Sequence, residues 1–276
     1  MNTNNWSGVN SEQSVTTTIT DSLSPGVSKL LPVLKILIFA SLLFAILTST
    51  SRASGQIKPN VQDPVPVMAY YYIWYDTQSW NRAKSDYPLL GRYSSDDRAI
   101  LEQHVRWAKD AGIDGFIVSW KSTFQLDSRL EQLMEVAAAE DFYLWIIYQG
   151  LDFDRYPLPT SQIEADLEYF IDQYAHHPAF SMYDRPVVIW SGTWEFSPQE
   201  IDEVTAGYRD QLYLLASEQN LAGYQRLAHL VDGNAYYWSS VNPDVNSRYQ
   251  EKLDAMGQAV HDHGGLWVAP AAPGFD

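Results

Sequence analysis

The chain has 276 residues, a formal net charge of −16, ten Trp and eighteen Tyr residues, and no cysteine. The lack of cysteine excludes disulfides, thiol chemistry and a lipobox, and the negative charge argues against nucleic acid, which requires a basic surface. The many Trp and Tyr side chains fit a protein that faces carbohydrate, although aromatic-rich cores also occur.

The amino-terminal part of the sequence changes character twice. Residues 1–27 are rich in Asn, Ser and Thr and have no apolar periodicity, so we expect them to be disordered. The apolar run 36–47 follows Lys35 and precedes the small-residue pattern at Ser51 to Ala53. A run of this length is typical of a secretory signal peptide, and counting back to Leu30 leaves a signal anchor as the alternative.

These features predict how the chain is divided and where it is located. We expect export, with the protein outside the cell or anchored to the membrane through residues 30–48 and facing outward. The predicted parts are a disordered polar segment at 1–27, a signal peptide or signal anchor at 28–53, a linker at 54–65, and a single barrel domain at 66–276.

The domain opens with a predicted strand, helix and strand. Residues 67–72 form a short apolar and aromatic run after a proline, which favours a buried strand. Residues 94–97 offer helix N-caps, apolar residues then recur at helical spacing from Ile100, and Gly112 ends the helix. A second strand follows at 114–120. Because a helical crossover returns the chain to the same end of the sheet, these strands are predicted to pair in parallel.

The same alternation continues to the end of the sequence. A capping box of Ser161 and Glu164 is predicted to open one helix, and Pro198 to open another. Seven strands can be counted, which predicts a (β/α)8 barrel with about seven of its eight units present. The alternative is an open doubly wound sheet. It is disfavoured because no glycine-rich loop follows the first strand. Further helices are expected at 126–140, 161–174, 217–228 and 245–263, and further strands at 142–148, 186–190, 212–215, 229–236 and 266–270.

Aromatic residues gather where the predicted strands end. Parallel strands deliver their last residues to one face, and aromatic planes there suit the apolar faces of sugar rings, although any single ring could equally belong to the core. We expect Tyr72, Trp74 and Trp120 to face a shared pocket. The predicted carbohydrate-binding residues are Tyr72, Trp74, Tyr75, Trp120, Tyr148, Tyr236 and Tyr237.

Acidic residues at the same strand ends are the candidate catalytic groups. Glycoside hydrolysis ordinarily needs two carboxyl groups, and no spacing in this sequence singles out a pair. Taken alone, each acid is more often a solvated loop carboxylate or a helix cap. The acids considered are Asp76, Asp152, Asp154, Glu195, Asp244 and Asp276, with Glu195 and Asp152 as the first to test.

No cofactor and no metal are expected. The adjacent histidines His176 and His177 point in different directions at a helix end, and no third ligand has a suitable spacing. Capping of the chain before Pro178 explains them better.

Three sequence blocks resemble glycoside hydrolase family 99 and its family 71/99-like bacterial relatives. They are residues 69–75 (AYYYIWY), 91–97 (GRYSSDD) and 106–120 (RWAKDAGIDGFIVSW). Weaker similarity continues at 177–180, 232–237 and 272–276. The resemblance implies a (β/α)8 barrel that acts on a glycan as an endo-acting α-mannosidase or α-glucanase.

The resemblance also implies where the catalytic residues should be. Family members carry two glutamates in a Trp-Asn-Glu-Trp type motif on the last barrel strand, and residues 1–276 contain no such motif. We therefore expect the chain to be cut off before that strand and to bind sugar without hydrolysing it. The family's Glu-Pro-Tyr segment corresponds to residues 147–150 (IYQG), which puts mannose-type recognition in doubt. A non-catalytic carbohydrate-binding protein is the alternative.

Overall fold

The computed structural model describes residues 65–82, 87–236, 246 and 248–271. The chain divides into two compact units, 1–55 and 56–276, and all of these residues belong to the second. The predicted disordered segment, the signal peptide or anchor, and the linker except its last residue, Val65, lie outside the described residues. Within the part that is described, no helix is long and apolar enough to cross a membrane.

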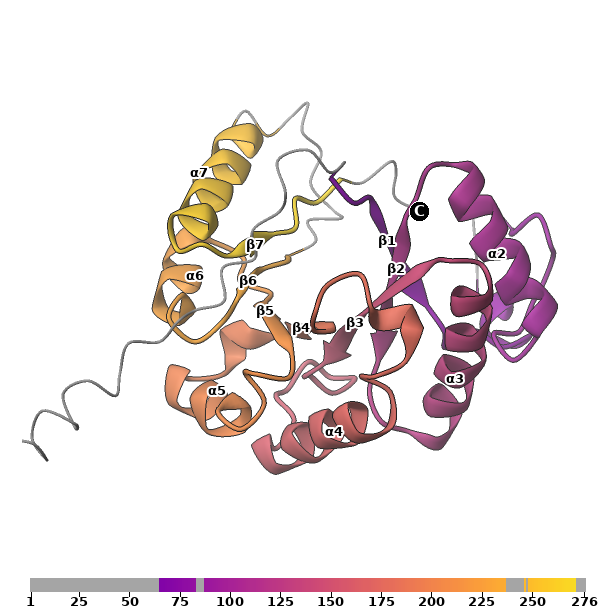
Figure 1. Ribbon diagram of the computed structural model, residues 1–276, viewed down its shortest axis with the longest axis horizontal. Helices are drawn as coiled ribbons and strands as arrows, with labels where there is room; N and C mark the ends of the chain where they lie inside the picture. The colour runs from indigo at the N-terminus through magenta and orange to yellow at the C-terminus, as the bar shows by residue number, and fades with distance from the viewer. Residues whose placement is uncertain (1–64, 83–86, 237–245, 247, 272–276) are drawn as a thin grey trace, which may run out of the picture. The chain divides into compact units, whose positions relative to one another are not determined.

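One sheet of seven parallel strands forms the centre of the second unit (Figure 1). The strands lie side by side in the order of the sequence, each paired with the next. Sequential order is that of a barrel rather than of a doubly wound sheet, in which the order reverses. The strands are β1 (Met68–Tyr72), β2 (Gly115–Trp120), β3 (Tyr143–Gln149), β4 (Val187–Ser191), β5 (Tyr213–Ala216), β6 (Gly233–Asn234) and β7 (Leu266–Trp267).

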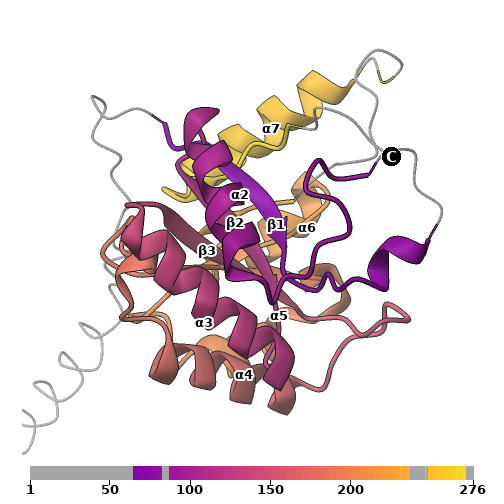
Figure 2. The same cartoon turned by 90° about the vertical axis from the view of Figure 1, so that its right-hand side faces the viewer.

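Helices connect the strands and cover one face of the sheet. Figure 2 shows α2, α3 and α4 lying outside the first strands. The helices are α2 (Arg98–Asp110), α3 (Phe124–Ala139), α4 (Thr160–Gln173), α5 (Pro198–Thr205), α6 (Leu221–Leu227) and α7 (Tyr249–Asp262), with 3-10 turns η1 (Ser79–Asn81), η2 (Pro178–Phe180) and η3 (Thr193–Glu195). The chain thus folds as a partial (β/α)8 barrel, which confirms the predicted fold class.

Alternate residues of each strand supply two separate cores. Side chains such as Val118, Ile146 and Val188 pack outward against the helices in the larger cluster. Their neighbours Ile117, Ile147 and Ile189 belong to a smaller inner cluster. Because both faces are apolar, the central strands are buried along their length, as parallel strands usually are.

A side-chain contact across the inner face shows that the sheet is curved. The hydroxyl of Tyr70 on β1 donates to the backbone oxygen of Ala235, just after β6, at 3.4 Å. Tyr70 also packs on the inner cluster, to which Ala235 belongs. The first and sixth strands therefore face each other across the inside of the sheet.

The helix boundaries follow local capping, with two departures from the sequence prediction. Asp97 caps α2, and Gly112 after that helix has a φ of 79°. The capping box predicted at Ser161 is wrong, because α4 begins at Thr160 and its N-cap Pro159 has no side chain that could accept a hydrogen bond. The predicted helix 217–228 begins only at Leu221, capped by Asn220, which leaves residues 217–220 as an exit loop of β5.

Candidate functional site

An aromatic patch stands at the carboxyl end of β1. Tyr72 stacks on Trp74 with ring centroids 4.4 Å apart, and Trp74 is 47% exposed. Tyr75, the next aromatic in the chain, stacks on the buried Trp80 at 4.7 Å. Tyr72, Trp74 and Tyr75, here called the aromatic patch, are three of the predicted carbohydrate-binding residues, and the structure brings them together.

The loop that carries the aromatic patch is fixed by hydrogen bonds. Trp80 Nε1 donates to the backbone oxygen of Tyr93 at 2.8 Å, and the backbone nitrogen of Ser95 donates to the backbone oxygen of Tyr75, also at 2.8 Å. The patch therefore sits on a braced loop rather than on a free one.

Arg129 of α3 is the central brace of this loop. Its guanidinium is fully buried and donates to both carboxylate oxygens of Asp96, at 2.6 and 2.7 Å, and to the backbone oxygen of Ile73 at 2.9 Å. The hydrogen bonds from Arg129 hold the pKa of the Asp96 carboxyl below its usual value, although Asp96 is itself largely exposed. Both ends of the β1–α2 connection are thus tied to α3.

A layer of polar side chains lies on the inner face beside the aromatic patch. Ser119 pairs in register with Tyr72, and Gln149 with Ser191. Ser119 and Gln149 lie two residues beyond Ile117 and Ile147 of the inner cluster. Because side chains alternate along a strand, Ser119 and Gln149 also point to the inside. Gln149 Nε2 donates to Ser119 Oγ at 3.0 Å. Sequence reasoning did not identify this layer as part of a site, because every residue of β2 is buried and the pattern does not show which face Ser119 occupies.

Two more aromatic side chains at this end of the strands were also missed. Phe124 is the first residue of α3, shortly after β2, and Phe153 lies in the loop after β3. Both are 93% exposed, which is unusual for a ring of this size and marks candidate contact points.

Trp120 and Tyr148 are not with the aromatic patch. Trp120 is fully buried in the outer core, where its Nε1 donates to Asp127 Oδ1 at 2.9 Å. Tyr148 is equally buried and donates to Asp166 Oδ2 at 2.9 Å. The expectation of a pocket shared by Tyr72, Trp74 and Trp120 is therefore wrong for Trp120, because it belongs to the strand face that packs on the helices.

Two of the candidate acids have local structural roles. Asp152 accepts from the backbone nitrogen of Tyr156 at 2.8 Å, and Asp76 accepts from the backbone of Gln78 and Ser79, which lowers its pKa. Glu195 and Asp154 are exposed. Asp244 and Asp276 lie outside the described residues, as does Tyr237.

Glu218 is an acid at the same end of the sheet that the sequence analysis missed. It follows β5 and is buried, and its carboxylate accepts from Arg226 Nη2 of α6 at 2.8 Å. Its backbone exchanges two hydrogen bonds with the side chain of Asn234, at 2.8 and 3.1 Å. Sequence reasoning assigned residue 218 to a helix, so it was not considered as a strand-end acid.

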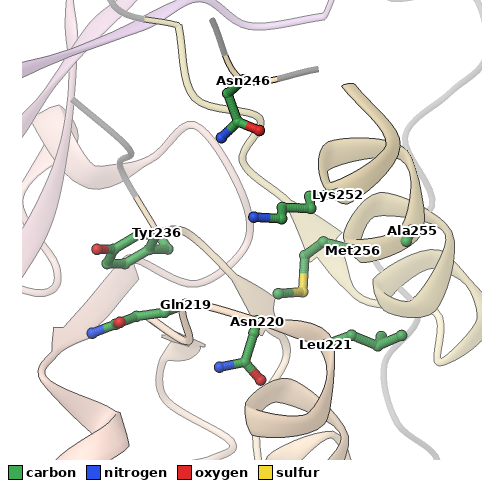
Figure 3. Close-up of a pocket in the computed structure, with 8 residues that line it drawn as sticks. All are labelled: Gln219, Asn220, Leu221, Tyr236, Asn246, Lys252, Ala255 and Met256. Atoms are coloured by element: carbon green, nitrogen blue, oxygen red, sulfur yellow. The ribbon is translucent and has the colours of Figure 1, made fainter. Parts of the chain in front are cut away.

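A cavity of about 410 Å³ lies beside the exit loop of β5 (Figure 3). Its lining includes the amide side chains of Gln219, Asn220 and Asn246, the ring of Tyr236, the ammonium of Lys252 and the side chain of Met256. Tyr236, another predicted binding residue, packs edge-on against Trp194 at 5.9 Å. We refer to this cavity as the Lys252 pocket.

His177, the second of the two adjacent histidines, has a structural role. His177 Nδ1 accepts from the backbone nitrogen of Ala179 at 3.3 Å and caps η2, and burial lowers its pKa. Among the residues that the structure describes, no group of three His, Asp or Glu side chains could hold a metal ion.

The parallel sheet, its outer helices and the polar and aromatic carboxyl end define a partial (β/α)8 barrel with its candidate site where barrel enzymes carry theirs. The family model for glycosyl hydrolase family 99 matches residues 76–207. The chain is a family 99-like protein.

Sequence relatives agree with this assignment. The glycoprotein endo-alpha-1,2-mannosidase of Mus musculus is 29% identical over 102 residues, and a human glycoprotein endo-alpha-1,2-mannosidase-like protein is 28% identical over the same length. Each match covers 36% of this chain and 22% of the relative, so the chain matches less than a quarter of the length of these relatives.

Solved structures agree in fold. A GH99 endo-alpha-mannosidase from Bacteroides thetaiotaomicron superposes with a TM-score of 0.62 at 19% identity, over 75% of this chain and 68% of that one. A structure described as a glycoside hydrolase-like protein gives a TM-score of 0.50 at 16% identity, over 74% and 69% of the two chains.

Proposed function

We propose that this protein acts on a glycan of the α-mannan or α-glucan type and binds it along the carboxyl end of the sheet. The observation that carries the proposal is the exposed Trp74, stacked on Tyr72 beside the inner polar layer. The family 99 match and the names of the relatives, endo-α-mannosidases, support the same substrate class.

The chemistry of the surface suits a sugar. A pyranose ring presents apolar C–H groups on its faces and hydroxyls at its edge. The aromatic patch offers rings for the faces, and Ser119 and Gln149 offer a hydroxyl and an amide for the edge. Phe124 and Phe153 would add contacts further along an extended glycan.

Our proposal for residues 1–276 is binding without efficient hydrolysis. Asp152 is held by the backbone of Tyr156, Glu218 is paired with Arg226, and Glu195 is exposed, whereas a general acid needs a desolvated place and no such partner. These pairings also favour the second candidate, a non-catalytic carbohydrate-binding protein. Export, proposed from the apolar run at 36–47, would place either protein among extracellular glycans.

The test is to measure binding and hydrolysis of α-mannan and α-glucan oligosaccharides by the full chain. Trp74→Ala should weaken binding about three- to tenfold, since one aromatic contact contributes about 0.5–1.5 kcal/mol beyond the area it buries. Trp107→Ala is the matched control, because Trp107 is 39% exposed but lies on α2 among the outer helices. Equal effects of the two substitutions would refute the proposed surface.

The hydrolysis measurement tests whether residues 1–276 bind glycan without turning it over. Turnover by the chain would contradict the proposal of binding alone, and Glu195→Gln and Asp152→Asn would then show whether either acid is responsible. A chain that binds neither glycan would refute both candidates.

A further inference from the structure

Hydrogen bonds between the ends of β5 and β6 support one side of the Lys252 pocket. Asn234, at the end of β6, accepts from the backbone nitrogen of Glu218 and donates to its backbone oxygen. This clamp joins the ends of β5 and β6, and the lining residues Gln219 and Tyr236 each lie within two residues of it. The backbone beside Gln219 and Tyr236 is therefore held before any ligand arrives, which lowers the entropic cost of binding at this side of the pocket.

A buried ion pair adds to this support. Arg226 of α6 donates to the Glu218 carboxylate at 2.8 Å and to the backbone oxygens of Phe196 and Thr193 at 2.6 and 2.7 Å. The exit loops of β4 and β5 are thereby tied to one guanidinium. Because Arg226 neutralises it, the Glu218 carboxylate does not cancel the positive charge at the pocket.

Lys252 is the one charged side chain among the described lining residues. It forms no ion pair with any residue in the described part of the chain. The acids beside it on α7 have other partners, since Glu251 pairs with Arg248 at 3.0 Å and Asp254 accepts from Gln250 at 2.8 Å. In a chain of net charge −16, this pocket is a local site of positive charge.

The remaining lining groups suit a sugar ring. In Figure 3 the Lys252 side chain extends from α7 over the pocket, with Asn220 below it and Tyr236 on the opposite side. Amides and a phenol can donate to and accept from ring hydroxyls, and Met256 gives an apolar wall. A volume of about 410 Å³ lies within the range of small-ligand sites.

We propose that the Lys252 pocket binds a hexuronic acid residue, with the sugar carboxylate on the Lys252 ammonium and the ring hydroxyls on Gln219, Asn220 and Asn246. This rests on the proposed function, that the chain binds glycans, and adds that part of the recognised glycan is acidic. The neutral part of such a glycan contacts the aromatic patch.

The experiment compares two oligosaccharides of the same length and linkage in calorimetric titrations with the full chain. One is a glucuronic acid trisaccharide and the other is its carboxyl-reduced counterpart, which is neutral. We expect the acidic trisaccharide to bind about tenfold more tightly, as one charge-assisted hydrogen bond at an exposed lysine would give, and the difference to shrink as salt is added.

Variants assign this preference to the pocket. Lys252→Gln should abolish it and Lys252→Arg should keep most of it. Lys109→Gln removes another exposed lysine, on α2 and away from the pocket, and should leave the preference for the acidic trisaccharide unchanged. Since Lys252 is exposed, its variants should melt at the wild-type temperature.

The outcomes separate this inference from the proposed function. Equal affinities of the wild type for the two trisaccharides, or a preference that survives Lys252→Gln, would overturn the uronate assignment. Binding of α-mannan or α-glucan oligosaccharides that depends on Trp74 would then still support the proposed function. Failure to bind any of these sugars would overturn both.

Discussion

The Asp96–Arg129 pair allows a quantitative test of how the aromatic patch is supported. Asp96→Asn keeps the side-chain shape but turns one acceptor into an amide nitrogen that faces the guanidinium, and it leaves the fully buried cation without its paired carboxylate. Losing one partner of a buried pair costs about 3–5 kcal/mol. Because the Asp96 side chain is 55% exposed, water offsets part of this cost, and we expect a loss of about 2–3 kcal/mol.

Thermal and urea unfolding measure this loss. For a unit of this size, 2–3 kcal/mol lowers the melting temperature by about 4–12 °C. Asp110→Asn changes an exposed acid at the other end of α2; it is the control and should stay within about 0.5 kcal/mol of the wild type. Equal stability of Asp96→Asn and Asp110→Asn would refute the reasoning.

The Asp96–Arg129 pair also predicts how the free energy of unfolding depends on pH. The folded-state pKa of Asp96 lies below its unfolded value of about 3.9, so the ionised form contributes stability above that pH and loses it as the pH falls through the folded-state pKa. The stability gap between wild type and Asp96→Asn should be constant above about pH 5 and should narrow below about pH 4. A gap that widens in acid would show that the carboxylate is not the stabilising form.

Three further changes test other parts of the description. Trp120→Phe should lower the melting temperature, because it removes the bond to Asp127, and should leave oligosaccharide binding unchanged; weakened binding without a loss of stability would contradict the outer-core placement. Asn234→Ala should destabilise by about 2–4 kcal/mol in urea unfolding, since both backbone groups of Glu218 lose their partner in a buried place; a smaller loss than about 1 kcal/mol would contradict the clamp. Trp74→Ala should weaken glycan binding with little change in melting temperature, because Trp74 is about half exposed; a large fall in melting temperature would instead assign it to the core.

The order of elements could be predicted from sequence because helices and strands differ in length and periodicity. Each of the seven strands was found within a few residues of its place, and the stop at Gly112 appears as a left-handed residue. The face of each strand residue could not be predicted in the same way. Every residue of β2 is buried, so the pattern gives no sign that Trp120 points to the helices while Ser119 points inside.

Glu218 shows a second limit of prediction from sequence. Its neighbours Leu221, Tyr224 and Leu227 have helical spacing, and the pattern extended the helix back over the exit loop of β5. The helix begins after its N-cap Asn220, and this cap could have been recognised in the sequence. The pairing of Glu218 with Arg226 and Asn234 depends on tertiary contacts that no local sequence pattern contains.

The strictly sequential order of the strands has a consequence for how the chain folds. Each strand pairs with the next one to be synthesised, so the sheet can grow by local steps without waiting for a distant segment. The bond from Tyr70 to Ala235 is different, since 165 residues separate its partners and it forms only when the growing sheet has curled. Its formation would be a late step of assembly, and Tyr70→Phe should therefore speed unfolding more than it slows refolding.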